Sequence, residues 1–297
     1  MTPNPALRKL GFSADDRVVI VHADDVGMCG ATVDAFFELA ERGVTSAGSV
    51  MVPCPWFPGV AAGYRGHADL DVGVHLTLTS EWESYRWGPI STRDPASGLI
   101  DEEGYFYRNQ DQWRNVDPQV IRSEAEAQVD RALATGLDVT HVDCHMFSML
   151  RPSLVGPYVS LGFDRQLPVL MTRQPQWVAA LSEAAIAGWE ERGLPIFDHL
   201  REMPLNEPPT QQLNLTKRLF DELPPGLTYL ITHPARDTPE LRAIAQDWRA
   251  RVADFETFRD DRLAHHLRRS GIQIIGWRPL RELMRTRRHR LLRGGET

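Results

Sequence analysis

The sequence predicts an α/β fold: an irregular (β/α) barrel, similar to a TIM barrel, in one domain spanning residues 1–297. Short apolar runs alternate with amphipathic segments, which is typical of parallel strands joined by crossover helices. About seven or eight such runs can be counted, which favours a closed barrel over an open sheet. No G-x-G-x-x-G follows the first run, which disfavours a dinucleotide-binding sheet. An open doubly wound sheet remains the alternative.

The first elements follow from apolar spacing. The β-branched run at 17–21 (RVVIV) predicts a strand buried on both faces. A helix is expected over 31–42 because its apolar residues share one helical face, and Gly43 ends it. Apolar runs at 45–52 and 71–78 predict the second and third strands.

A long insertion is expected after the third strand, over about 79–116. It is rich in Trp, Tyr, Gly and Pro and shows no period, as in loops that cover a site. A helix over 119–135 follows, with apolar residues on one face and Gly136 as its end. The run at 139–144 predicts the fourth strand.

The second half continues the alternation less regularly. The run at 227–232 (LTYLIT) predicts a buried strand, and Gly271 separates the last helix from the last strand. The other expected elements are a strand at 167–171, a helix at 177–192, a weak strand at 195–197, a helix at 214–223, a helix at 258–269 and a strand at 272–277.

Composition excludes several classes of protein. The net charge of −7 argues against nucleic-acid binding, and the basic segment at 285–297 is expected to be a solvated tail or a helix face. Three cysteines without a C-x-x-C pair predict neither a disulfide framework nor a zinc knuckle. We see no signal peptide and no apolar run of about 18 residues, so we expect a cytoplasmic protein without a membrane partner.

Polar side chains follow several predicted strands. Asp24 and Asp25 end the first strand, and a buried strand that ends on two carboxylates needs a partner such as a metal cation. His75 lies late in the third strand, His145 ends the fourth, and His233 follows the strand at 227–232. Because parallel strands end at the same rim, we expect these five side chains to converge.

This set of side chains suits metal-dependent hydrolysis. Two imidazoles and one carboxylate can hold a divalent ion and leave positions open for water and substrate. A second carboxylate can then remove a proton from water, and a separate histidine can protonate the leaving group. His141 and Asp143 are placed to orient the ligands. Zinc or magnesium fits such a site, and so do manganese and cobalt.

Each residue also has a structural interpretation. A single Asp at this position can cap the next helix, His75 can be a buried core histidine, and His233 before Pro234 can belong to a turn. Cys144 is better explained as a small buried hydrophobe than as a nucleophile. Trp82 and Trp87 can stack on sugar faces or anchor the insertion.

Seven motifs together resemble the YdjC/ChbG-type carbohydrate deacetylases. In chain order they are VIVHADDVG, GVTSAGSVM, VGVHLTLTSEW, GLIDEEGYF, THVDCH, THPA and GIQIIGWRPL, covering about residues 17 to 280. The resemblance implies a divergent (β/α) barrel that uses a divalent metal to remove N-acetyl groups from acetylated amino sugars such as chito-oligosaccharides.

The resemblance also implies a role for each residue. Asp25, His75 and His145 would hold the metal, Asp24 would be the general base, and His233 would be the general acid. The chain departs from the family at His22, where members usually have Asn, at Val26, where an aromatic is usual, and at 146–149, where further histidines are usual. These departures leave the sugar specificity open.

Two alternatives remain at this point. One is a phosphoesterase or esterase on the same scaffold, for which Arg173 and Arg236 after predicted strands could hold an anion. The other is a sugar-binding protein without turnover, which the presence of both Asp24 and His233 disfavours. The sequence leaves open the metal, the sugar and whether the chain forms a homo-oligomer.

Overall fold

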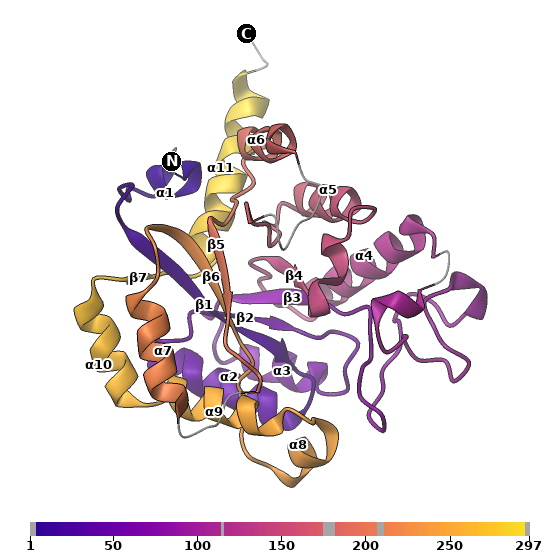
Figure 1. Ribbon diagram of the computed structural model, residues 1–297. Helices are drawn as coiled ribbons and strands as arrows, with labels where there is room; N and C mark the ends of the chain where they lie inside the picture. The colour runs from indigo at the N-terminus through magenta and orange to yellow at the C-terminus, as the bar shows by residue number, and fades with distance from the viewer. Residues whose placement is uncertain (1–3, 114–115, 175–181, 207–210, 295–297) are drawn as a thin grey trace.

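The computed structural model describes residues 4–113, 116–174, 182–206 and 211–294, with side chains to residue 286. Its centre is a curled sheet of parallel strands with helices on the outside (Figure 1). The strands are β1 (Arg17–Val26), β2 (Ala47–Val50), β3 (Val72–Leu76), β4 (Val142–Cys144), β5 (His199–Glu202), β6 (Gly226–Thr232) and β7 (Gln273–Ile274).

The strand order is β4-β3-β2-β1-β6-β5. Strand β7 pairs with the first part of β1, on the same side of β1 as β2. Single bridges extend the sheet beyond β4, from Val142 to Val169 and from Thr172 to Phe197, which leads into β5. The sheet therefore curls from β4 back towards β5. The expected α/β class with parallel strands is confirmed.

The α-helices are α1 (Pro5–Lys9), α2 (Gly30–Arg42), α3 (Phe57–Tyr64), α4 (Pro118–Ala134), α5 (Val155–Arg165), α6 (Glu183–Arg192), α7 (Gln212–Asp221), α8 (Pro239–Ile244), α9 (Trp248–Phe258), α10 (Asp261–Ser270) and α11 (Arg278–Gly294). Three short 3-10 segments are η1 (Pro95–Ser97), η2 (Gln110–Gln112) and η3 (His145–Leu150). None of the helices in the described part of the chain is long and apolar enough to cross a membrane.

Two expected strands are reduced to bridges. The runs at 167–171 and 195–197 carry Pro168 and Pro195, which have no amide proton to donate to a ladder. Of the helix expected at 177–192, residues 177–181 lie outside the described residues, and α6 begins at Glu183. Helix α9 was not expected. The described part of the insertion at 79–116 holds only η1 and η2 as helical segments, as a covering loop would.

The strands alternate between two cores. In β1, Val18 and Ile20 pack in an inner cluster with Tyr229 and Trp277, whereas Val19 packs outwards against α9 and α10. Successive residues of a strand face opposite sides, so His22 and Asp24 share the inner face. The same alternation brings side chains from β3, β4 and β6 into the interior, where the polar site lies above the apolar cluster.

Candidate metal centre

Three of the predicted side chains meet at the carboxyl ends of β1, β3 and β4. Asp25 Oδ1 lies 3.3 Å from His75 Nε2 and 3.0 Å from His145 Nδ1. The exposed fractions of Asp25, His75 and His145 are 1%, 2% and 5%. Asp25 Oδ1 has no hydrogen-bond partner among the described residues. A buried carboxylate oxygen without a hydrogen bond, facing two imidazole nitrogens, fits a divalent cation.

Backbone strain accompanies this arrangement. Asp25 has φ +60°, and Met146 and Phe147, directly after His145, have φ +51° and +52°. Side chains other than glycine seldom adopt this left-handed region, although Asp tolerates it better than most. Such strain is typical of functional sites, where the surrounding fold fixes an unfavourable backbone to aim a side chain.

His75 is oriented by a carboxylate. Its Nδ1 lies 2.9 Å from Asp143 Oδ1, which leaves Nε2 directed at Asp25. The other oxygen of Asp143 accepts hydrogen bonds of 2.9 Å from Ser49 and from Tyr229. A carboxylate behind a ligating histidine fixes its tautomer and ring orientation. The structure therefore places Asp143 where the sequence predicted a ligand-orienting residue.

Two further contacts come from residues that the sequence did not point to. His145 Nε2 lies 3.0 Å from Glu81 Oε2, which leaves Nδ1 directed at Asp25. Arg251, buried on α9, donates to Asp25 Oδ2 at 2.7 Å. Asp25 thus has one oxygen fixed by a guanidinium and the other directed at the histidines.

The charges of the site balance around the histidines. Burial works against ionisation of Asp25, but the charges of His145 and Arg251 hold its pKa well below the usual range. Burial lowers the imidazole pKa values, yet Asp143 and Asp24 raise the pKa of His75 well above normal, and Glu81 and Asp25 raise the pKa of His145 to about 9. Two imidazolium protons carry the same charge as one divalent cation, so an ion can replace them without changing the net charge.

Metal affinity is expected to rise with pH. A metal binds neutral imidazole, and a raised pKa means that the proton is held until the pH exceeds that value. Below about pH 9 the affinity should therefore fall by up to about tenfold per pH unit for each proton displaced. Calorimetric titration of the metal-free protein, in buffers of different ionisation enthalpy, counts the protons released. Zinc binding with no proton release at pH 7 would contradict this charge balance.

Asp24 lies next to the three candidate ligands. Its Oδ1 lies 2.7 Å from His22 Nδ1, and its Oδ2 lies 3.8 Å from His75 Nε2. It lines a cavity of about 220 Å³ together with Asp25, His75, His145 and His233. Oδ2 is thus the oxygen that faces the ligands.

His233 directly follows β6 and lines the same cavity. Its backbone N–H donates to Asp254 Oδ2 at 2.9 Å, and Gln212 donates to the other oxygen of Asp254 at 2.7 Å. Burial raises the pKa of Asp254 to about 7 and lowers the pKa of His233. His233 Nδ1 is buried without a hydrogen-bond partner among the described residues.

Four of the predicted outer residues do not line the cavity. Arg173 pairs with Glu190 and with Asp198, and Arg236 pairs with Glu38, so neither contributes its charge to the cavity. The other two are Trp87 and His141. Trp87 is buried, its Nε1 donates to the carbonyl of Thr79 at 2.8 Å, and its ring lies edge-on to that of His145 with 6.5 Å between centroids. His141 contacts His22 instead of a candidate ligand. Trp82, by contrast, lines the cavity.

Three residues that contact the candidate site residues were not predicted from the sequence: His22, Glu81 and Arg251. His22 is two residues before Asp24 in a strand, so the alternation of side chains along a strand is the signal that could have placed it beside the site. Glu81 lies in the loop after β3 and Arg251 on α9, and neither carries a local pattern that distinguishes it from a surface charge.

The chain is similar to proteins of known family. A family model described as YdjC-like protein matches residues 18–269. A protein of Thermus thermophilus named carbohydrate deacetylase is 33% identical, over 94% of this chain and 98% of the relative. A carbohydrate deacetylase of Thermoanaerobacter pseudethanolicus is 24% identical, over 88% of this chain and 98% of its own length.

A crystal structure shows the same fold. It is that of an Enterococcus faecalis V583 protein provisionally named a cellobiose-phosphate cleavage protein. The TM-score is 0.75 with 21% identity, covering 89% of this chain and 99% of the other. At this identity the likeness bears on the fold alone.

Proposed function

The chain belongs to the YdjC-like family, as its motifs predicted, and we propose that it is a metal-dependent hydrolase of acetylated amino sugars. It would remove the N-acetyl group from an amino sugar or a chito-oligosaccharide and release acetate. The name of the Thermus thermophilus relative supports a carbohydrate deacetylase. The observation that carries the proposal is the buried Asp25 Oδ1, which lies 3.3 Å from His75 Nε2 and 3.0 Å from His145 Nδ1 in a cavity that Asp24 and His233 also line.

Asp25, His75 and His145 would hold the metal. A divalent ion in such a site polarises a carbonyl oxygen and lowers the pKa of water. Zinc or magnesium suits the donor set, and manganese or cobalt can replace them. An irregular (β/α) barrel accounts for how three strands bring these side chains to one rim.

The protein's own groups would supply the proton transfers. Asp24 Oδ2 would accept a proton from the attacking water, because Oδ1 is already occupied by His22. His233, which lines the same cavity, would donate a proton to the departing nitrogen. The lowered pKa of His233 makes its imidazolium a better acid for that step. The indole of Trp82 lines the cavity and would stack on the sugar.

The pairing of two arginines favours a deacetylase over a phosphoesterase. That alternative depended on Arg173 and Arg236 as anion-binding groups, and both are paired with acidic residues outside the cavity. A deacetylase needs no such group because its substrate is neutral at the acetyl end.

The proposal is tested by acetate release. Elemental analysis of the purified protein would be followed by loading with zinc, magnesium, manganese or cobalt and by screening N-acetylated amino sugars of different length. We expect free amine and acetate in equal amounts from at least one sugar, and none after chelation. Release of phosphate from sugar phosphates, with no acetate from any acetylated sugar, would overturn it.

Replacing His233 by alanine should affect amides more than activated esters. General acid catalysis contributes typically about 100- to 10,000-fold, and a nitrophenolate leaves without a proton, whereas an amine does not. We therefore expect a large loss of kcat on an acetylated amino sugar and a small loss on 4-nitrophenyl acetate. His265→Ala, at an exposed position on α10, is the control. Equal losses on both substrates would argue against a proton-donating role.

A further inference from the structure

We propose that Asp24 is oriented by a buried relay of hydrogen bonds through His22, His141 and Thr140, with Asp71 as the terminal donor. These are positioning residues, since none of the four lines the cavity. The proposal rests on the proposed function only in giving Asp24 the role of general base. The relay itself can be tested in the protein without metal.

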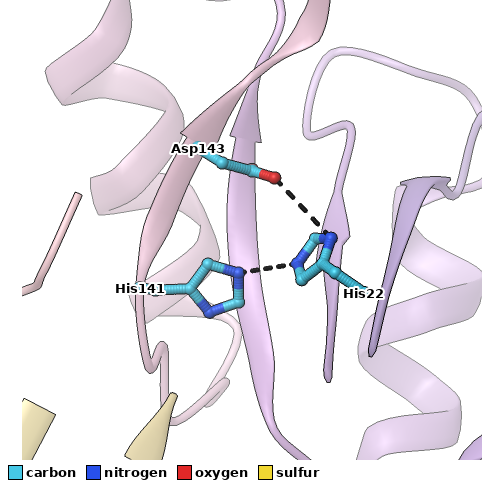
Figure 2. Close-up of side chains that lie close together, drawn as sticks. All are labelled: His22, His141 and Asp143. Atoms are coloured by element: carbon cyan, nitrogen blue, oxygen red, sulfur yellow. Dashed lines mark hydrogen bonds and ion pairs between the residues drawn. The ribbon is translucent and has the colours of Figure 1, made fainter. Parts of the chain in front are cut away.

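The contacts form an unbroken line through the interior. His22 Nδ1 lies 2.7 Å from Asp24 Oδ1, and His22 Nε2 lies 2.8 Å from His141 Nε2, as Figure 2 shows for the two rings. His141 Nδ1 lies 2.9 Å from Thr140 Oγ1, and Thr140 Oγ1 makes a short hydrogen bond with Asp71 Oδ1. Asp71 directly precedes β3, so the line runs from the amino end of the sheet to the rim that holds the site.

Close packing fixes the middle of this line. His141 is fully buried, and its ring stacks on Trp277 with 4.6 Å between centroids and 8° between planes. A Cβ at Gly73 would lie 2.4 Å from the His141 ring, so only glycine leaves room for it. His22 and Thr140 are also fully buried. Water therefore does not exchange with these polar atoms, and each must be satisfied by its neighbour.

The direction of each hydrogen bond in the relay can be derived from its Asp24 end. An ionised Asp24 is an acceptor, so the proton of that contact belongs to His22 Nδ1. If His22 carries only this proton, its Nε2 is an acceptor, and His141 must donate from its Nε2. Burial and the nearby His22 lower the pKa of His141, which favours a neutral ring. His141 Nδ1 is consequently an acceptor.

The other end of the relay completes the order. Thr140 has one hydroxyl proton, which it donates to His141 Nδ1 in this order. In the hydrogen bond between Thr140 and Asp71 the donor must then be Asp71. Asp71 Oδ2 accepts the backbone N–H of Arg278 at 2.7 Å, which leaves Oδ1 to carry the proton. Burial raises the pKa of Asp71, against the lowering effect of its contacts with Thr140 and Arg278.

The opposite order is the rival arrangement. With Asp71 ionised, Thr140 would donate to it, His141 would donate to Thr140, and His22 would donate to His141 from Nε2. His22 would then need a second proton to contact Asp24, which places an imidazolium in the interior. The two orders differ in which nitrogen of His141 carries the proton and in the charge of His22.

A second metal ion is a less suitable explanation of the same side chains. His22, His141 and Asp143 have ligand atoms within 4.8 Å of one another. Asp143 lies 3.8 Å from His22 Nδ1, and its oxygens already accept from His75, Ser49 and Tyr229. The Nε2 atoms of His22 and His141 lie 2.8 Å apart, which is the distance of a hydrogen bond between them.

The first test uses variants of equal shape in the metal-loaded protein. Asp71→Leu removes the donor and should lower kcat by about tenfold with little change in KM or metal content, as loss of an orienting partner does. Asp71→Asn should recover most of this loss, since its amide N–H can donate to Thr140 while its oxygen accepts from Arg278. Thr140→Val should match Asp71→Leu, and Thr140→Ser should resemble the unsubstituted protein. An Asp71→Asn variant as impaired as Asp71→Leu would overturn the donor order.

The second test needs no activity. Long-range proton–nitrogen NMR spectra of the metal-free protein show which ring nitrogens are protonated. We expect Nδ1–H on His22 and Nε2–H on His141, unchanged in Asp71→Asn. A doubly protonated His22, Nδ1–H on His141, or a second equivalent of zinc bound by these rings would each overturn the relay. Failure of the proposed function would instead appear as absent acetate release with the expected spectra.

Discussion

Asp24→Asn is expected to lower kcat on an acetylated amino sugar by about 100- to 10,000-fold, the usual contribution of general base catalysis. Asparagine has the same shape, and its oxygen can still accept the proton of His22 Nδ1. The amide cannot take a proton from water at Oδ2. Because Asp25, His75 and His145 are unchanged, the metal content should remain that of the unsubstituted protein. The measurements are kcat, KM and metal per chain for both proteins.

The control for this variant is Asp34→Asn, at an exposed position on α2, which should change neither quantity. Loss of metal together with activity would place Asp24 among the ligands. Full activity with metal bound would remove Asp24 from the proton transfer, and the base would have to be sought among the other acidic residues that line the cavity, Glu81, Glu202 and Asp247.

The positions of the central residues could be predicted because parallel strands place their carboxyl ends at one rim. Asp25, His75 and His145 are separated by 50 and 70 residues in sequence, yet strand assignment alone predicted that they meet. The roles given to them stay predictions. The position of His22 follows from alternation along the same strand, because it shares a strand face with Asp24.

Other contacts could not be predicted from one sequence. Arg251 contacts Asp25 from α9, a helix that the sequence did not predict. The helix has more than one arginine, and nothing in the local sequence shows which of them is buried. Arg173 and Arg236 follow predicted strands, but a strand end does not say whether an acidic neighbour such as Asp198 or Glu38 takes up the charge. Pairing partners depend on tertiary packing, which sequence spacing does not specify.

Arg251→Met is expected to destabilise the metal-free protein by about 3–5 kcal/mol, the usual effect of removing one partner from a buried ion pair. Arg251 is 3% exposed and donates to Asp25 Oδ2, and methionine fills similar volume without a charge. Saturating metal should make the loss smaller, because a divalent ion also compensates Asp25. The free energy of unfolding is measured by denaturant titration with a chelator and with saturating metal.

Thermodynamic linkage makes this prediction specific to a metal at Asp25. If the substitution costs more stability without metal than with it, the variant must bind the metal more tightly by the same free energy, and calorimetry measures that affinity independently. Arg249→Met, at an exposed position on the same helix, is the matched control and should change neither quantity by much. Equal destabilisation with and without metal, with unchanged affinity, would show that the ion does not sit against Asp25.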